Sequence, residues 1–253
     1  MAGHSKWANI KHKKAAADKK RGKAFSKASK EIIMAAKIGG GDPESNPRLR
    51  LAISSAKAVN LPKDTIEKAI KKGCGELEGE NLDELSYEGY GPEGVAIMVD
   101  CLSDNRNRTA SEIRYIFSRN NGNLASSGAV AFMFHRKCHF VIEGEHADED
   151  KLMELFFEND VDIESIELIE DGRAEVYGAP EAFNAAVTVF EQNDIVPVES
   201  SIVRQPETMT EITDVDVANR VIRLIDALEE NEDSQHVYSN VDFSEEVLKA
   251  LEE

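Results

Sequence analysis

Between residues 137 and 206 the apolar residues alternate between strand-length and helix-length patterns, and this order constrains the fold more than any other feature. Strand-like runs occur at 138–142, 163–169, 173–177 and 197–203, and helical patterns occur at 149–158 and 180–192. Taken in order these elements give β-α-β-β-α-β, the signature of a ferredoxin-like α/β sandwich. We therefore predict a ferredoxin-like domain over residues 137–206.

A second set of elements flanks this module on both sides. A buried strand at 95–102, a helix at 108–119 and a strand at 129–134 precede it, and a helix at 215–229 and a strand at 236–241 follow it. The two flanks complete one another, which predicts a second ferredoxin-like α/β domain built from residues 79–136 and 207–253. The 137–206 domain is then an insertion into it.

Residues 1–78 have a different pattern, with apolar residues at helical spacing and lysines on the other faces. A first helix is expected from about residue 15 to residue 37, and the Gly39-Gly40-Gly41-Asp42-Pro43 stretch ends it. Further helices are expected from Pro47 and after Pro62, the last stopping at Gly73. The predicted fold class is therefore α+β multidomain, with an N-terminal three-helix domain followed by two ferredoxin-like α/β domains, the last inserted into the middle one.

Charge is strongly segregated along the chain. Residues 1–72 contain 18 cationic side chains against six carboxylates, a formal charge of +12. Because the whole chain of 253 residues carries −18, residues 73–253 together carry −30. Such segregation predicts a partner rather than a fold, and a basic segment on an acidic protein favours nucleic acid. A solvated surface is the alternative for these lysines.

The basic extension and the start of the first helix are the best candidates for nucleic-acid binding. Cations neutralise phosphates and a planar ring can stack on a base. The candidate residues here are Lys6, Trp7, Lys11, His12, Lys13, Lys14, Lys19, Lys20, Arg21 and Lys23. Trp7 has an equal alternative as a core anchor at the edge of the helices.

Two arginines form a second candidate. Arg106 and Arg108 lie at the predicted start of a helix, after the cap-forming Asp104-Asn105 pair. A helix N-terminus flanked by arginines can bind an anion such as phosphate. The alternative is local capping together with ion pairs to nearby carboxylates.

The sequence supports no catalytic, metal or cofactor site. It contains no phosphate-binding G-x-x-x-x-G-K-[ST] loop and no G-x-S-x-G nucleophile motif. His135, Cys138 and His139 cluster, but no second pair of ligands follows at zinc-site spacing. We therefore expect a protein that is not an enzyme, with no small-molecule substrate.

The chain is expected to be cytoplasmic and to have no membrane partner. No run reaches the ~18 apolar residues of a membrane span, and the three cysteines lie far apart, which favours free thiols in a reducing compartment. The basic N-terminus lacks the apolar region of a secretory signal. An organellar transit peptide is the alternative, but the segment is rich in Lys rather than in Ser and Arg.

Four motifs make the chain resemble the YebC/PmpR family, whose mitochondrial relative is the translational activator of cytochrome c oxidase subunit one. They are Ala2-Gly3-His4-Ser5-Lys6-Trp7-Ala8-Asn9-Ile10-Lys11-His12, Gly39-Gly40-Gly41-Asp42-Pro43, Tyr87-Glu88-Gly89-Tyr90-Gly91-Pro92 and Leu102-Ser103-Asp104-Asn105-Arg106-Asn107-Arg108-Thr109. The resemblance implies three domains and a non-enzymatic cytoplasmic regulator. Members are described as probable DNA-binding transcriptional regulators, and some are tied to translation on the ribosome.

One loop departs from the family pattern. Where relatives read G-G-N-L-G followed by G-S-V, this chain has Asn121-Gly122-Asn123-Leu124-Ala125 and then Gly128-Ala129-Val130. Asn tolerates a left-handed backbone and Ala does not, so a contact assigned to this loop in the family does not transfer to this chain.

The leading hypothesis is a DNA-binding regulator of transcription whose basic segment binds phosphates. A ribosome-associated translation factor that binds ribosomal or transfer RNA is the runner-up, and a scaffold whose acidic domains bind a basic protein is a third hypothesis. The sequence contains no recognised DNA-reading module that separates the first two.

Overall fold

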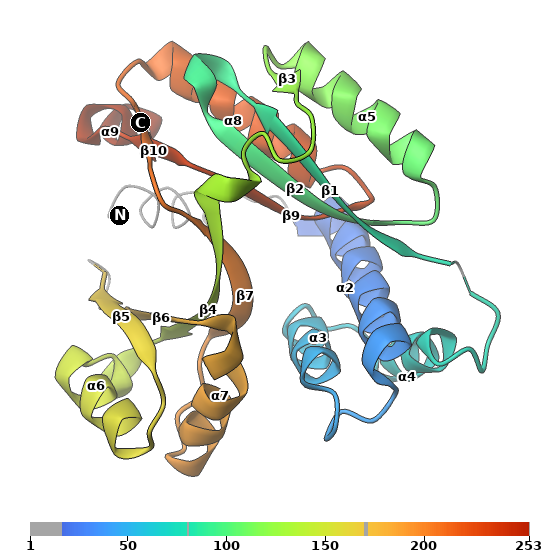
Figure 1. Cartoon of the computed structure of the whole chain (residues 1–253), viewed down its shortest axis with the longest axis vertical. Helices are drawn as coiled ribbons and strands as arrows, with labels where there is room; N and C mark the ends of the chain where they lie inside the picture. Colours follow the sequence, from blue (N-terminus) through green and yellow to red (C-terminus); the bar gives the residue numbers. More distant parts are fainter. Residues whose placement is uncertain (1–16, 80, 170–171, 253) are drawn as a thin grey trace. The chain divides into compact units, whose positions relative to one another are not determined.

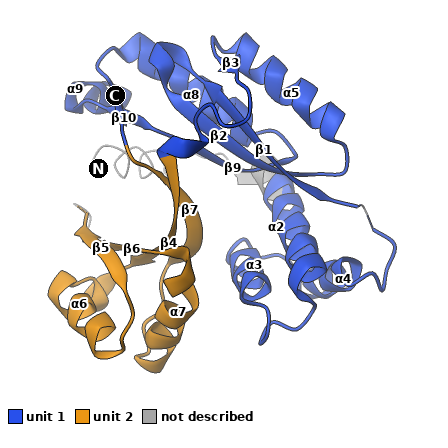
Figure 2. Cartoon of the chain, viewed as in Figure 1, with its two compact units in different colours: residues 1, 3–133, 208–253 blue, residues 2, 134–207 orange. Residues whose placement is uncertain are grey.

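The fold is given by a computed structural model that describes residues 17–79, 81–169 and 172–252, with the side chains of 17–21 and 252 left aside (Figure 1). The described chain forms two compact units. Unit 1 contains the residues up to 133 and from 208 onward, and unit 2 contains residues 134–207 (Figure 2). The predicted division of unit 1 into a helical and an α/β domain near residue 78 stays a prediction.

Unit 1 begins with the three predicted helices, which are confirmed. They are α2 (Ala17–Gly39), α3 (Pro47–Ala58) and α4 (Lys63–Gly73). Their shared core consists largely of small and branched side chains: Ile32, Ala35, Ala36, Leu49, Ala52, Ala56, Leu61, Ile66 and Ala69. Small side chains let the helices approach closely, and at Gly73 an added Cβ would lie 2.4 Å from the carbonyl oxygen of Ile33.

A buried asparagine joins the end of α2 to the start of α3. The Asn46 side-chain oxygen accepts the Leu49 N–H at 3.1 Å and so caps α3. Its amide nitrogen donates to the carbonyl oxygens of Ala35 and Gly40, both at 2.8 Å. One side chain therefore satisfies free backbone groups at both helix ends.

Replacing Asn46 by Ala should lower the free energy of unfolding by about 2 kcal/mol, because the cap is lost and two carbonyls lose a donor. Urea unfolding measures the change. The matched control is Asn107→Ala, since Asn107 is exposed on a helix, and it should change the value by less than about 0.5 kcal/mol. Equal effects of the two substitutions would contradict this role for Asn46.

The α/β part of unit 1 is built on a four-stranded sheet of order β3-β1-β2-β9. Its strands are β1 (Asp83–Tyr90), β2 (Ala96–Ser103), β3 (Asn123–Leu124) and β9 (Ser234–Ser239). The helices α5 (Arg106–Arg119) and α8 (Val215–Glu229) lie side by side over the sheet (Figure 1). Strand β2 is buried along nearly its whole length, as its apolar run predicts.

Shorter elements complete this part of the unit. Strand β8 (Thr210–Ile212) pairs in parallel with β10 (Val241–Phe243), and α9 (Glu245–Glu252) follows. Two 3₁₀ turns are present, η1 (Pro92–Gly94) and η2 (Ala131–Met133). The core joins residues from α5, α8, α9 and the central strands around Phe117 and Leu224.

Two details of the prediction for this part are wrong. The elements begin with a β1-β2 hairpin, so their order is not that of a ferredoxin-like domain. Residues 129–134 also do not form one strand, because η2 occupies 131–133. The strand is missing because of Glu88 on β1. Its buried carboxylate accepts the N–H groups of Gly128, Val130 and Ala131 at 2.7, 2.8 and 2.8 Å.

The two substituted glycine positions in this loop behave differently. Asn121 has φ of 59°, the left-handed backbone that Asn tolerates. Ala125 is not among the residues with positive φ, and its N–H donates to the Glu88 carbonyl oxygen at 2.8 Å. The backbone therefore needs no glycine at Ala125.

Unit 2 has the predicted β-α-β-β-α-β order. Its elements are β4 (Phe134–Ile142), α6 (Glu149–Glu158), β5 (Ile163–Leu168), β6 (Ala174–Gly178), α7 (Phe183–Gln192) and β7 (Glu199–Pro206), with the 3₁₀ turns η3 (Gly144–His146) and η4 (Pro180–Ala182). The antiparallel sheet has the order β5-β6-β4-β7. Phe140 on β4 contacts Phe183 and Phe190 of α7, and Phe190 contacts Phe156 of α6, so the two helices share an aromatic core with the sheet.

Candidate nucleic-acid interface

The predicted binding residues fall into three groups. Lys6, Trp7, Lys11, His12, Lys13 and Lys14 lie outside the described residues. Lys19, Lys20 and Arg21 lie within helix α2, and their side chains also lie outside the description. The side chains of Lys23, Arg106 and Arg108 are described, and each has a partner within unit 1.

Lysines along one face of α2 bond to the α/β part of unit 1. Lys23 and Lys27 donate to the carbonyl oxygens of Glu230 and Glu229, both at 2.8 Å. These carbonyls end helix α8, where backbone acceptors are unpaired and the helix dipole is negative. Lys23, which the sequence suggests as a nucleic-acid-binding residue, therefore holds α2 in place together with Lys27.

The row continues toward the C-terminus of α2. Met34 packs in a small buried cluster with Leu82 and Leu102, and Lys37 donates to the Leu82 carbonyl oxygen at 2.9 Å. The spacing 23, 27, 30, 34 and 37 places all these side chains on one helix face. That spacing is visible in the sequence, but the sequence does not show which backbone carbonyls the lysines bond to.

The centre of this contact is Asp233, which is 2% exposed. One carboxylate oxygen accepts Lys30 Nζ at 2.7 Å. The other accepts a hydroxyl or guanidinium donor from three residues: Ser103 at 3.0 Å, Arg108 at 2.9 Å and Thr109 at 2.7 Å. Lys30, Ser103, Thr109 and Asp233 were not predicted as a site.

The donors shift the protonation equilibrium of this carboxyl. Burial alone raises the pKa of Asp233, but the hydrogen bonds from Lys30, Arg108 and Thr109 outweigh burial and hold the pKa well below its usual range. The pKa of Arg108 is raised in turn, first by its hydrogen bond to Asp233 and then by that to Asp104. Asp233 is therefore an ionised carboxylate at neutral pH.

Replacing Asp233 by Asn should lower the free energy of unfolding by about 3 kcal/mol at pH 7, because the half-buried Lys30 loses its ion pair and keeps its charge. Denaturant unfolding measures it. Asp162→Asn, which changes an exposed carboxylate, is the control and should have an effect of less than about 0.5 kcal/mol. A loss at Asp233 as small as that of the control would contradict the structural role of the cluster.

The stability that Asp233 contributes should depend on pH in one direction. Its pKa is lower in the folded than in the unfolded chain, so the contribution is present above the unfolded value of about 3.9 and is lost as the pH falls below it. The difference in unfolding free energy between the wild type and Asp233→Asn should therefore shrink between about pH 5 and pH 3. A difference that grows in this range would reverse the assigned sign.

Arg106 and Arg108 differ in how firmly they are held. Arg108 is bonded to buried Asp233 and to Asp104, whereas Arg106 forms one ion pair with Asp83 at 3.0 Å and its side chain is 67% exposed. The Asn105 side chain caps α5 by accepting the Arg108 N–H at 3.1 Å. Capping and ion pairs thus occupy the start of α5. Of Arg106 and Arg108, Arg106 is the more accessible.

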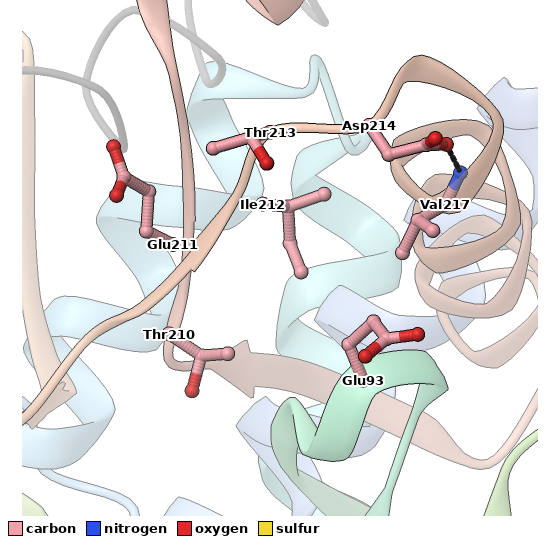
Figure 3. Close-up of a pocket in the computed structure, with 7 residues that line it drawn as sticks. All are labelled: Glu93, Thr210, Glu211, Ile212, Thr213, Asp214 and Val217. Carbon is pink, nitrogen blue, oxygen red and sulfur yellow. Dashed lines mark hydrogen bonds between the residues drawn. The ribbon is translucent and has the colours of Figure 1, made fainter.

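A shallow hollow of about 440 Å³ lies in unit 1 at the start of α8 (Figure 3). Three carboxylates line it, from Glu93, Glu211 and Asp214. The Asp214 carboxylate accepts the Val217 N–H at 2.9 Å and so caps α8. An acidic lining repels phosphate, so this hollow is not a candidate for nucleic-acid binding.

The titratable side chains of the described residues form neither a metal site nor a reactive thiol. No group of three His, Cys, Asp or Glu side chains among them is arranged to hold a metal ion. The three cysteines are free, and burial raises the pKa of Cys101 to about 12 and that of Cys138 to about 11, so neither is a reactive thiolate. None of the described helices has both the length and the apolar character that a membrane span requires.

These observations define an α+β multidomain protein with a basic helical segment anchored to an acidic α/β part. The chain matches two family descriptions in succession: "TACO1/YebC protein N-terminal domain" over residues 5–76 and "TACO1/YebC second and third domain" over residues 82–241. The chain belongs to the TACO1/YebC family.

Similar proteins cover the whole chain. A protein of Chromohalobacter salexigens named "Probable transcriptional regulatory protein" is 49% identical over 252 residues and covers 100% of both chains. One from Syntrophomonas wolfei with the same name is 47% identical and covers 99% of this chain and 100% of the relative. The crystal structure of the conserved hypothetical protein Aq1575 from Aquifex aeolicus has a TM-score of 0.84 and 44% identity, and covers 96% of this chain and 98% of its own.

Proposed function

We propose that this protein is a non-enzymatic nucleic-acid-binding regulator whose basic N-terminal segment binds phosphates. The observation that carries the proposal is the division of charge, +12 over residues 1–72 and −30 over the remainder. A basic segment of this strength attracts a polyanion, while an acidic remainder of the chain disfavours unspecific spreading over it.

The hydrogen bonds that α2 makes within unit 1 narrow the set of residues that can bind phosphate. Lys23, Lys27, Lys30 and Lys37 donate to groups of the α/β part. We therefore assign phosphate binding mainly to the cations that precede Lys23, and we assign to Lys23 the role of anchoring the helix. Arg106, exposed at the start of α5, is the favoured contributor from the α/β part.

The relatives favour DNA as the first candidate ligand. Proteins 47–49% identical over their whole length are named probable transcriptional regulatory proteins, which supports a cytoplasmic regulator of transcription that binds duplex DNA. RNA bound during translation is the second candidate. The observation in its favour is an exposed tyrosine beside an arginine on α5, a pair suited to unpaired bases.

The basic extension is tested by replacing Lys11, Lys13 and Lys14 with Ala. Each phosphate contact releases a counterion, so log affinity falls with log salt in proportion to the number of contacts. The triple variant should bind a DNA duplex more weakly, and its salt slope should be smaller by about 2 to 3 if all three lysines contact phosphates. Fluorescence anisotropy at salt concentrations between about 50 and 200 mM provides the measurement.

A matched triple variant controls for the loss of three charges. Lys63, Lys151 and Lys249 pair with carboxylates one helical turn away on exposed helix surfaces, and replacing them with Ala should leave the salt slope unchanged. Equal slopes for the wild type and the Lys11, Lys13 and Lys14 variant would remove phosphate binding from the extension. A wild type with no salt dependence at all would favour a protein scaffold.

Sedimentation of a cell lysate separates the two nucleic-acid candidates. We expect the protein on chromosomal DNA, in fractions insensitive to ribonuclease, if transcription is its role. Co-sedimentation with ribosomal subunits that ribonuclease abolishes would instead establish the RNA candidate. The full chain is needed, because removing α2 would uncover Leu82 and Leu102, which pack against Met34.

A further inference from the structure

Helix α5 presents an outward face unlike those of its neighbours. Thr109, Ile113 and Phe117 point into the core of unit 1. The opposite side is exposed and combines arginines with short polar side chains and a tyrosine: Asn107, Ser111, Arg114, Tyr115 and Arg119. Arg106, three residues before Thr109, lies on the side of the core residues and pairs with Asp83.

The charge of α5 has the opposite sign to that of its surroundings. The helix carries four arginines and one carboxylate, that of Glu112, which accepts the Asn231 side-chain amide at 2.8 Å. Among the described α-helices after residue 73, α5 alone has a net positive charge. A cationic helix on a part of the chain that carries −30 offers a local site for an anion.

The arginines of this face are not equally engaged. Arg119 donates a hydrogen bond to the Tyr115 hydroxyl, whereas the exposed Arg114 guanidinium forms no ion pair with a described residue. Arg114 and Tyr115 are consecutive residues, and the long arginine side chain can reach a phosphate that adjoins a base stacked on the ring.

Tyr115 lies beside Arg114 and is 60% exposed, although a buried position would remove its ring from water. The Arg119 guanidinium donates to the Tyr115 hydroxyl at 2.9 Å, and its central carbon is 6.0 Å from the ring centroid. At that distance the guanidinium lies over one face of the ring in a cation–π contact, and it also holds the hydroxyl end. The ring is therefore fixed in orientation, and its 60% exposure leaves aromatic surface accessible.

We infer that the outward face of α5 is a binding site for a single-stranded nucleic-acid segment, with an unpaired base stacked on Tyr115. Arg114 contacts the adjoining phosphate, and Arg119 holds the ring. Stacking requires a free base face, which a duplex does not offer along its length. This site rests on the proposed nucleic-acid function and specifies the strand state of the ligand.

Two simpler roles for this face account for fewer of its features. A Tyr and an Arg four residues apart stabilise a helix weakly by themselves, but this does not explain why the helix is cationic or why the ring is exposed. A protein partner would also accept tyrosine and arginine. The cationic charge of α5, together with the basic N-terminal segment, favours a polyanion.

The test uses the full-length protein and three fluorescent 12-nucleotide probes in anisotropy titrations: single-stranded oligouridine, single-stranded oligothymidine and an oligothymidine–oligoadenosine DNA duplex. Tyr115→Ala should weaken single-strand binding about tenfold, because one stacked base is lost. Tyr115→Phe keeps the ring and should stay within about twofold of the wild type. Duplex binding by Tyr115→Ala should change by less than about threefold.

Phe132→Ala is the matched control, since Phe132 is another exposed aromatic residue of unit 1, 70% exposed. It should leave the affinity for all three probes unchanged. Circular dichroism establishes that each variant is folded, and Arg119→Ala should weaken single-strand binding less than Tyr115→Ala does. Tighter binding of oligouridine would identify RNA as the source of the strand, and tighter binding of oligothymidine would identify single-stranded DNA.

Three results would overturn the site. They are an unchanged single-strand affinity in Tyr115→Ala, an equal loss on single strand and duplex, and a loss in Tyr115→Phe as large as that in Tyr115→Ala. In each of these the wild type still binds nucleic acid, so the proposed function stands while the α5 site fails. A wild type that binds none of the probes would instead remove the proposed function itself.

Discussion

The ion pair between Lys30 and Asp233 is the interaction on which unit 1 depends. Asp233 lies between α8 and β9, Lys30 lies on α2, and the other donors come from the end of β2 and the start of α5. A buried carboxylate is costly unless its oxygens are satisfied, so each donor supports the position of the others. An apolar contact such as that of Met34 allows two elements to shift relative to one another. Four donors directed at two oxygens instead fix the relative position of the elements that supply them.

The elements that local patterns encode were predictable, and those that depend on distant partners were not. The bounds of α3 and α4 follow from Pro47, Pro62 and Gly73, and the element order of unit 2 follows from its alternating periodicity. The strand expected at 129–134 failed because Glu88, some 40 residues earlier, takes the backbone N–H groups that a strand would use. No local pattern shows where a buried carboxylate will direct its oxygens.

The candidate site divides in the same way. The cationic segment is visible as composition, and the Arg106 and Arg108 pair is visible as a helix start. That several lysines of α2 bond to backbone carbonyls was not predictable, since every residue offers the same carbonyl. The spacing of Tyr115 and Arg119 was readable at i and i+4, but the exposure of the ring depends on how α5 packs against the sheet. The segregated charge thus has a use within the molecule, which is seen only in the fold.

The way the chain enters and leaves unit 2 explains how a large insertion fits within one domain. It enters on β4 and returns on β7, and these are neighbouring antiparallel strands with Phe134 opposite Pro206. The two connections to unit 1 therefore start from adjacent points, like the two strands of a hairpin. The entropic cost of closing the chain across this insertion is therefore small for unit 1. A change in the length of residues 134–207 should therefore have little effect on how unit 1 closes its own core.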